Sequence, residues 1–286
     1  MTNILVTGAD GQLGYDVVKA LLAKKYQPLG VDRKEMDLMN NEEVEKVLAD
    51  LNPDAIIHCG AYTAVDQAEI EIEQCYQVNA VATKIMAIYA KKQDIPFIYI
   101  STDYVFDGKK EGKYVETDQP NPINVYGASK LKGEEYVRML LEKYFIVRIS
   151  WVFGVNGNNF VKSMLRLGKE RDEINVVDDQ VGSPTATADL APLLVSMLES
   201  EKYGLYHVTN EGYCSWFKFA KEIFKQFQID VKVNPISSAS FPVLAKRPMN
   251  SKMSKNKLVE AGFSPLPTWK KALENWRGEN EKNQKT

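Results

Sequence analysis

Tyr126 and Lys130 are the residues whose types and spacing most clearly offer chemistry. They end the segment Tyr126-Gly-Ala-Ser-Lys130, and on a helix positions i and i+4 share one face. An ammonium beside a phenol lowers the pKa of that phenol from about 10 towards neutrality, which suits a residue that transfers protons. Tyr15 and Lys19 have the same spacing, but they lie just behind a glycine-rich turn, on a helix expected to serve packing. Tyr126 is the better candidate of the two tyrosines, because the strand predicted before it ends near Thr102, whose hydroxyl would lie at the carboxyl end of that strand.

The glycine-rich turn reads Thr7-Gly8-Ala-Asp-Gly11-Gln-Leu-Gly14 and follows the first apolar run of the chain. Its spacing is GxxGxxG, and no Gly-Lys-Ser/Thr follows, which disfavours a P-loop. Glycines in this place allow a tight turn and close approach to a pyrophosphate, while the helix that follows supplies free amides. We therefore predict that this turn binds a dinucleotide through Gly8, Asp10, Gly11, Gln12, Leu13 and Gly14.

Asp32 stands 18 residues after the last glycine, at the end of the second predicted strand. A carboxylate there accepts hydrogen bonds from an adenosine ribose and selects NAD. Arg33 follows directly and could pair with the 2′-phosphate of NADP instead. The sequence leaves NADH and NADPH both open.

Short apolar runs that alternate with helical patterns would position these residues. Strand-like runs cover 4–7, 28–32, 55–58, 96–101 and 145–149, and helical patterns cover about 11–24, 41–51, 66–92 and 124–142. Strands rich in Ile and Val, separated by helices, predict a doubly wound α/β fold, which is a parallel sheet of the Rossmann kind. Ligands of such sheets bind at the carboxyl ends of the strands.

After Trp151 the alternation loosens. Helical patterns near 158–171, 187–200 and 215–228 accompany one further strand at 204–209, a Pro- and Ser-rich segment at 235–248 and a basic tail. We predict a dinucleotide-binding domain from residues 1–153 plus about 181–209. A smaller, discontinuous C-terminal substrate domain would comprise about 154–180 and 210–286.

Charge limits the classes of partner. The 286 residues carry 36 Lys and Arg against 38 Asp and Glu, a net charge of −2, which gives no electrostatic case for nucleic acid. From Val243 onward, ten basic residues face four acidic ones. This local excess of +6 is either a solvated tail or a cationic surface for an anionic ligand, and the sequence leaves both open.

The three cysteines are an odd number without paired spacing, and no membrane-length apolar stretch or leader is legible. We expect a cytoplasmic protein without disulfides. His58 and His207 both lie in apolar runs, so we interpret them as buried core residues. No cluster with metal-ligand spacing exists, so we predict no metal-ligating residue.

Longer motifs narrow the function. The segments are Gly60-Ala-Tyr-Thr-Ala-Val-Asp-Gln-Ala-Glu69, Ser101-Thr-Asp-Tyr-Val-Phe106, Asn124-Val-Tyr-Gly127, Arg148-Ile-Ser-Trp-Val-Phe153, Asn158-Asn-Phe160, Asp179-Gln-Val-Gly-Ser-Pro184 and Arg247-Pro-Met-Asn-Ser251. With the glycine turn and the Tyr/Lys pair, they resemble the dTDP-4-dehydrorhamnose reductase family of extended short-chain dehydrogenases/reductases, from about residue 3 to 275. The resemblance implies reduction of dTDP-4-dehydro-L-rhamnose to dTDP-L-rhamnose by NADH or NADPH, the last step in making that sugar donor.

The resemblance also implies residue roles. Tyr126 would be the general acid, Lys130 would support it and bind the nicotinamide ribose, and Thr102 would hold the carbonyl oxygen. Further cofactor contacts would come from Asp37, Leu38, Ala61, Tyr62 and Thr63, and substrate contacts from Thr102, Asp103, Tyr126, Trp151, Arg247 and Asn250. Lys252 stands where relatives usually carry Arg, which leaves its role open. Family members are associated with Mg²⁺ at a dimer contact, so a homodimer is a further implication.

Three alternatives remain at this point. In sugar-nucleotide 4,6-dehydratases the triplet at the strand end resembles Thr-Asp-Glu. This chain has Thr102-Asp103-Tyr104 and so lacks the carboxylate at the third position. The sequence does not exclude an epimerase, although the C-terminal motifs disfavour one. A non-catalytic, NADP-binding regulatory subunit like that of methionine adenosyltransferase is the third, and the intact Tyr126/Lys130 pair favours an enzyme over it.

Overall fold

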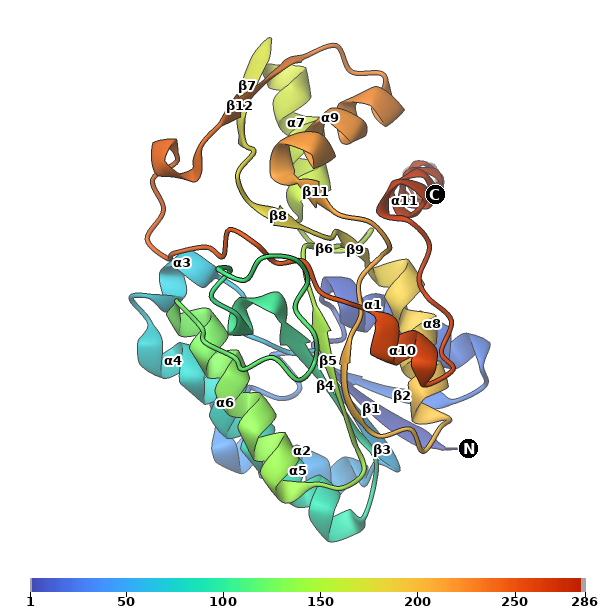
Figure 1. Ribbon diagram of the computed structural model, residues 1–286. Coiled ribbons are helices and arrows are strands. Elements are labelled where there is room, and N and C mark those ends of the chain that lie inside the picture. The colour runs from blue at the N-terminus through green and yellow to red at the C-terminus, as the bar shows by residue number, and fades with distance from the viewer. Residues whose placement is uncertain (1, 284–286) are drawn as a thin grey trace.

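A six-stranded parallel sheet forms the centre of the protein (Figure 1). The computed structural model describes residues 2–283. The strands lie in the order β10-β5-β4-β3-β1-β2, and their bounds are β1 Asn3–Thr7, β2 Gln27–Val31, β3 Ala55–His58, β4 Phe97–Thr102, β5 Tyr144–Ile149 and β10 Gly204–His207. The prediction of a doubly wound α/β fold is confirmed, because short Ile- and Val-rich runs buried on both faces suit a sheet that helices cover.

Alternation of side chains along the strands builds two cores. In β1, Ile4 and Val6 pack under α1 (Gln12–Ala23) and α8 (Thr187–Leu198). Leu5 points to the other face, which α2, α5 and α6 cover. The bounds of these three helices are α2 Asn41–Leu51, α5 Ala82–Gln93 and α6 Val125–Leu140. Each helix therefore buries its apolar stripe against the sheet.

The helix predicted over 66–92 is not continuous, so that prediction is wrong in part. The segment divides into α3 Val65–Ala68, α4 Ile72–Tyr76, a π-helical turn Gln77–Val81 and α5. The helix is interrupted between α3 and α4, whereas the π turn continues from α4 into α5 and contains Asn79. The side chain of Asn79 accepts from the amide of Tyr62 at 2.8 Å and donates to the carbonyl of Tyr62 at 3.1 Å. A single-turn π insertion commonly marks a functional segment.

A second cluster of elements lies beyond the carboxyl ends of the strands, at the top of Figure 1. Aromatic side chains unite it, among them Phe153, Phe219 and Trp276. Its elements are β6 Val152–Phe153, α7 Phe160–Glu170, β7 Glu173–Val177, β8 Val181–Gly182, β9 Thr185–Ala186, β11 Cys214–Ser215, α9 Trp216–Phe227, β12 Lys232–Ile236 and α11 Trp269–Asn283. The short strands pair as β6–β9, β8–β11 and β7–β12.

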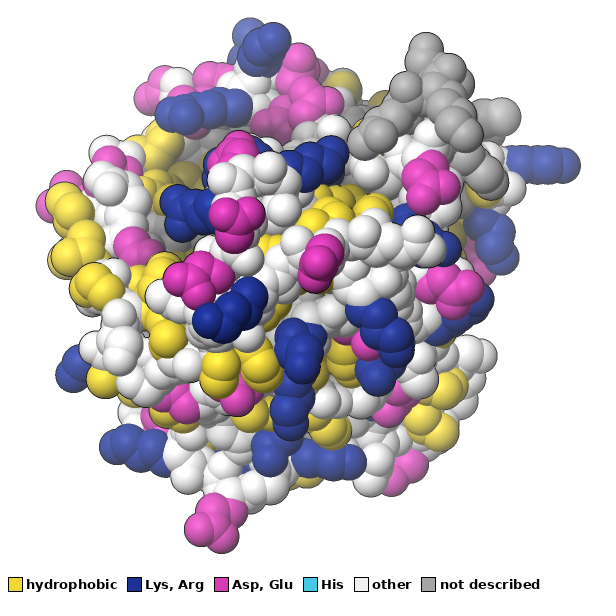
Figure 2. All heavy atoms as spheres, turned by 90° about the horizontal axis from the view of Figure 1, so that it is seen from above, with side chains coloured by type: hydrophobic (Ala, Val, Ile, Leu, Met, Phe, Trp, Pro, Cys, Tyr) yellow, Lys and Arg dark blue, Asp and Glu magenta, His cyan; other side chains and the backbone are white. Residues whose placement is uncertain are grey.

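The predicted basic tail is largely structured. It holds α10 (Asn256–Glu260) and the long helix α11, which the sequence analysis missed. Leu258, Phe263 and Leu266 pack into the core beneath α1 and α8. Figure 2 shows acidic and basic side chains interspersed over the face seen from above.

The two histidines are buried, as predicted. His58 is 1% exposed and His207 is fully covered. His58 Nδ1 lies 2.6 Å from the hydroxyl of Thr7, and its Nε2 lies 3.1 Å from that of Thr83. Loss of solvent lowers the pKa of His58 well below its usual value. A neutral imidazole thus joins the carboxyl ends of β1 and β3.

Candidate active site

A cavity of about 810 Å³ opens at the carboxyl ends of the strands. It lies at the end of β1, which has β2 on one side in the sheet and β3 on the other, so the direction of the strand order reverses there. Doubly wound sheets bind ligands at such a switch point. The sequence-predicted residues in its wall are Gly8, Gly11, Gln12, Leu13, Asp32, Arg33, Asp37, Leu38, Ala61, Tyr62, Thr63, Thr102, Asp103, Tyr126, Lys130 and Trp151.

The glycine turn shapes one end of the cavity. Gly8 has φ +64, and a Cβ there would lie 2.9 Å from the Cα of Gly60. A Cβ on Gly14 would collide with the carbonyl oxygen of Gly8, so this glycine serves helix–turn packing and does not line the cavity. Gly11 begins α1 without any side-chain cap from the described residues. The first amides of α1 therefore remain available to an anion.

Asp32 follows β2 directly and faces the glycine turn. One carboxylate oxygen accepts from the amide of Asp10 at 2.9 Å, and the other accepts from the amide of Arg33 at 2.7 Å. These backbone donors fix the orientation of the carboxylate at the cavity wall. Asp10 contributes through its backbone, and its side chain lies outside the lining.

Tyr126 reaches Thr102 because the start of α6 packs tightly on the turn after β4. A Cβ on Gly127 would collide with the carbonyl oxygen of Tyr104, so only glycine permits this approach. Asn124 caps the helix by accepting from the amide of Gly127 at 2.7 Å. The rings of Tyr104 and Tyr126 then meet edge to face, with centroids 5.7 Å apart.

Burial changes the proton affinities of the Tyr/Lys pair in opposite senses. It raises the pKa of Tyr126, a shift that the hydrogen bond with Thr102 opposes. The lowering expected from Lys130 is therefore not the net result. Lys130 is 2% exposed, its Nζ lies 4.1 Å from the ring centroid of Tyr99, and burial lowers its pKa to about 7. The pair thus combines a phenol that keeps its proton with a lysine whose pKa lies near neutral pH.

Asp103 is buried in the same wall. Its Oδ1 accepts from the Thr102 hydroxyl at 3.0 Å, whereas Oδ2 has no partner at bonding distance among the described residues. Burial raises the pKa of Asp103 to about 6. A buried oxygen without a partner is costly unless a ligand satisfies it, so this carboxylate is a candidate ligand contact.

The sequence analysis missed several wall residues. Trp216 stacks on Trp151 with centroids 3.7 Å apart and ring planes 13° apart. Glu71 accepts from the hydroxyl of Tyr62 at 2.6 Å. Gln12, by contrast, is one of the predicted residues, and it also accepts from the amide of Gly154 at 3.0 Å, which joins the glycine turn to the second cluster. The aromatic pattern of 215–228 was the available signal for Trp216, but its partner could not be read from the sequence.

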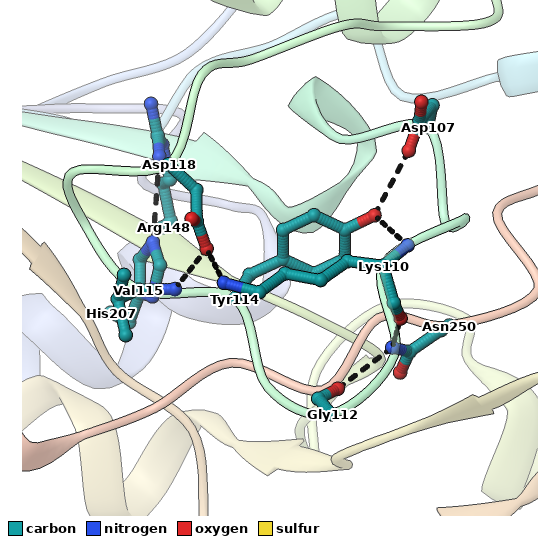
Figure 3. A network of polar contacts seen from close by, with 9 residues as sticks. All are labelled: Asp107, Lys110, Gly112, Tyr114, Val115, Asp118, Arg148, His207 and Asn250. Atoms are coloured by element: carbon teal, nitrogen blue, oxygen red, sulfur yellow. Dashed lines mark hydrogen bonds and ion pairs between the residues drawn. The ribbon is translucent and has the colours of Figure 1, made fainter.

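Arg247 and Asn250 lie outside the cavity lining. Arg247 Nη2 donates to Asp66 at 2.6 Å. Asn250 donates to the carbonyls of Lys110 and Gly112, at 2.6 and 2.8 Å, and so holds the loop that Figure 3 shows. The amide nitrogen of Asn250 is therefore committed to protein partners, whereas Nη1 of Arg247 is buried without a hydrogen-bond partner among the described residues.

The described residues 2–283 contain no group of three or more His, Cys, Asp or Glu side chains placed to hold a metal ion. Asp16 is buried, accepts from the hydroxyl of Thr187 at 2.5 Å and lies 3.8 Å from the ammonium of Lys19. The described residues of the single chain therefore give no support for a Mg²⁺ site. Among the described residues, no helix has the length and apolarity needed to cross a membrane.

Comparisons with known proteins identify the family of this chain. The family described as "RmlD substrate binding domain" matches residues 1–280. The dTDP-4-dehydrorhamnose reductase of Aggregatibacter actinomycetemcomitans is 43% identical, with 97% of this chain and 99% of the relative covered. The chain belongs to the dTDP-4-dehydrorhamnose reductase family.

Solved structures of the family superpose closely. The Bacillus anthracis dTDP-4-dehydrorhamnose reductase in complex with NADP is 45% identical, with a TM-score of 0.94. The superposition covers 98% of this chain and 100% of the Bacillus chain. The Clostridium acetobutylicum protein is 41% identical, with the same coverage and a TM-score of 0.95. A Thermus thermophilus UDP-glucose 4-epimerase, at 18% identity and a TM-score of 0.83, shares the fold alone.

The lowered pKa of Lys130 predicts a pH-dependent stability difference. Between about 7 and the ordinary 10.5, the unfolded chain binds a proton at this lysine that the folded chain does not hold, so wild-type stability rises with pH there. Below about 7 the cost of the buried charge is fully present. Lys130→Met should therefore be more stable than wild type at low pH, and the gain should shrink by up to about 1.4 kcal/mol per pH unit.

Urea unfolding of both proteins over that pH range measures the difference. Lys169→Met, at an exposed position of α7, corrects for the general loss of a lysine. A stability gain that stays constant with pH would contradict the assignment.

Proposed function

We propose that this protein uses NADPH or NADH to reduce the 4-keto group of dTDP-4-dehydro-L-rhamnose, giving dTDP-L-rhamnose. The observation that carries the proposal is one cavity with a dinucleotide turn at one end and Tyr126, Lys130 and Thr102 in its wall. Membership of the dTDP-4-dehydrorhamnose reductase family supplies the sugar nucleotide. The product would serve polysaccharide synthesis, and a 36% identical relative is named a spore coat polysaccharide biosynthesis protein.

The residues of the turn fit a dinucleotide. The close approach at Gly8 and the uncapped start of α1 suit a pyrophosphate, and Asp32 suits an adenosine ribose. We assign Asp37, Leu38, Ala61, Tyr62 and Thr63 to the same cofactor site. When bound, the reduced nicotinamide supplies a hydride to the carbonyl carbon of the sugar.

The chain supplies the proton. As the carbonyl oxygen gains negative charge, the hydroxyl of Thr102, which donates to Asp103 in the structure, would turn to donate a hydrogen bond to it, and Tyr126 would transfer its phenolic proton. The raised pKa of Tyr126 suits this direction, because a general acid must enter the reaction protonated. Lys130 assists by placing its ammonium in the same buried wall, where it can also bind the nicotinamide ribose.

Four further residues would bind the sugar nucleotide. Asp103 offers its unpartnered Oδ2, and Trp151 offers an indole in the cavity wall. Arg247 and Asn250 would serve the diphosphate, and Arg247 has Nη1 without a partner while Nη2 contacts Asp66, which could be exchanged for phosphate oxygens. A guanidinium favours that exchange because it binds phosphate in a bidentate manner.

The two-part organisation follows from these roles. Residues 1–153 plus about 181–209 would bind the cofactor, and about 154–180 plus 210–286 would bind the sugar nucleotide. The core contacts of Leu258, Phe263 and Leu266 would anchor the second part to the sheet. A homodimer remains a prediction from the family resemblance.

The alternatives fit the site less well. A dehydratase needs a carboxylate two residues after Thr102, and the chain has Tyr104 there, partly buried beside Tyr126. A regulatory subunit needs no proton donor, yet the Tyr/Lys pair lies intact in the cavity.

Tyr126→Phe tests the proposal. Loss of the general acid should reduce kcat/KM by about 100- to 10,000-fold, while the phenyl ring keeps the packing on Tyr104. The measurement is NADPH and NADH oxidation with dTDP-4-dehydro-L-rhamnose, together with cofactor binding by fluorescence. Cofactor binding should be retained. No oxidation by the wild type with either cofactor would refute the reductase.

Asp32→Ala tests the ribose assignment. Loss of a charged acceptor should weaken the binding of NADH by about tenfold or more. The binding of NADPH should weaken much less, because the same carboxylate repels its 2′-phosphate. Titration of both cofactors measures the two affinities. Arg33→Ala is the matched control and should weaken NADPH more than NADH. Equal losses for the two cofactors in Asp32→Ala would exclude the assignment.

A further inference from the structure

Trp151 adopts a backbone conformation that a bulky residue rarely accepts. Its φ is +49, in the left-handed region that favours glycine. It lies between β5 and β6, two residues after the end of β5, and lines the cavity together with Thr102 and Asp103. Such strain persists only where surrounding contacts fix the residue, and it concentrates at functional sites.

Two contacts fix the indole of Trp151. Trp216 stacks on it in nearly parallel planes, with centroids 3.7 Å apart. Gly182 packs so closely that a Cβ there would lie 2.8 Å from Cε2 and 3.0 Å from Cζ2 and Nε1 of the indole. The indole therefore has no free space towards either neighbour.

The fold brings these neighbours together through one small ladder. β8 pairs antiparallel with β11, with Cys214 opposite Gly182, and Trp216 begins α9 immediately after β11. Ser215 caps α9 by accepting from the amide of Lys218 at 3.2 Å. Phe160 supports Trp216 at a centroid distance of 4.6 Å. Trp216 is thus held by elements of the second cluster while its partner extends from the sheet.

We propose that Trp216 is a positioning residue that holds the Trp151 indole in its strained, cavity-facing orientation and so sets affinity for the sugar nucleotide. The inference rests on the proposed function, because it takes Trp151 as a substrate contact. It adds a determinant of KM that touches neither the proton donor nor the glycine turn. The stack joins the two parts of the molecule at the place where the substrate would lie.

Trp216→Leu removes the stack but keeps an apolar side chain. The KM for dTDP-4-dehydro-L-rhamnose should rise by about three- to tenfold, as expected for one aromatic pair, with kcat changed less and the Kd for NADPH unchanged. Trp216→Phe should recover most of the loss, because a phenyl ring can still stack. Trp276→Leu is the matched control: it removes an indole from the same hydrophobic cluster, outside the cavity lining, and should leave KM unchanged.

Gly182→Ala changes the second contact of the Trp151 indole. It tests the inference independently of whether Trp216→Leu folds normally. The added methyl should displace the indole and raise KM in the same way. The inference is overturned if neither variant changes KM, or if Trp216→Leu weakens NADPH as much as the sugar nucleotide. Turnover by the wild type in the same assay separates either result from a failure of the proposed function.

Discussion

The start of α6 packs directly on the carbonyl oxygen of Tyr104, and the geometry of the candidate site depends on that contact. Gly127 has no room for a Cβ, so the helix approaches β4 more closely than any other residue type would allow. This approach places Tyr126 beside Thr102, and Lys130 follows one helical turn later. The three side chains come from two elements, yet a single backbone contact sets their spacing.

Burial then determines the chemistry of the site. Loss of solvent disfavours the charged form of every group, so it raises the pKa of Tyr126 and lowers that of Lys130. A phenol that keeps its proton suits donation to a developing alkoxide. The sequence analysis expected the opposite shift for Tyr126, because i,i+4 spacing shows which groups are near but not how dry their surroundings are.

Local patterns predicted the sheet, the glycine turn and the Tyr/Lys pair, because each depends on residues close in the sequence. Long-range contacts account for what was missed. Asn79 binds the backbone of Tyr62, 17 residues earlier, and it lies in the π turn within the expected helix. Trp269 and Trp276 are buried along α11, a spacing that was legible but obscured by the charges of the tail. The pairing of Arg247 with Asp66 spans 181 residues and left no local signal.

The candidate site therefore joins a dinucleotide turn, a partly buried proton donor and an aromatic wall in one cavity. The most direct test follows the hydrogen atom itself. Wild-type protein is supplied with dTDP-4-dehydro-L-rhamnose and NADPH that carries deuterium at both C4 positions of the dihydronicotinamide. Proton NMR and mass spectrometry should then show dTDP-L-rhamnose with one deuterium at sugar C4. Product with protium at C4, or no dTDP-L-rhamnose at all, would contradict the account.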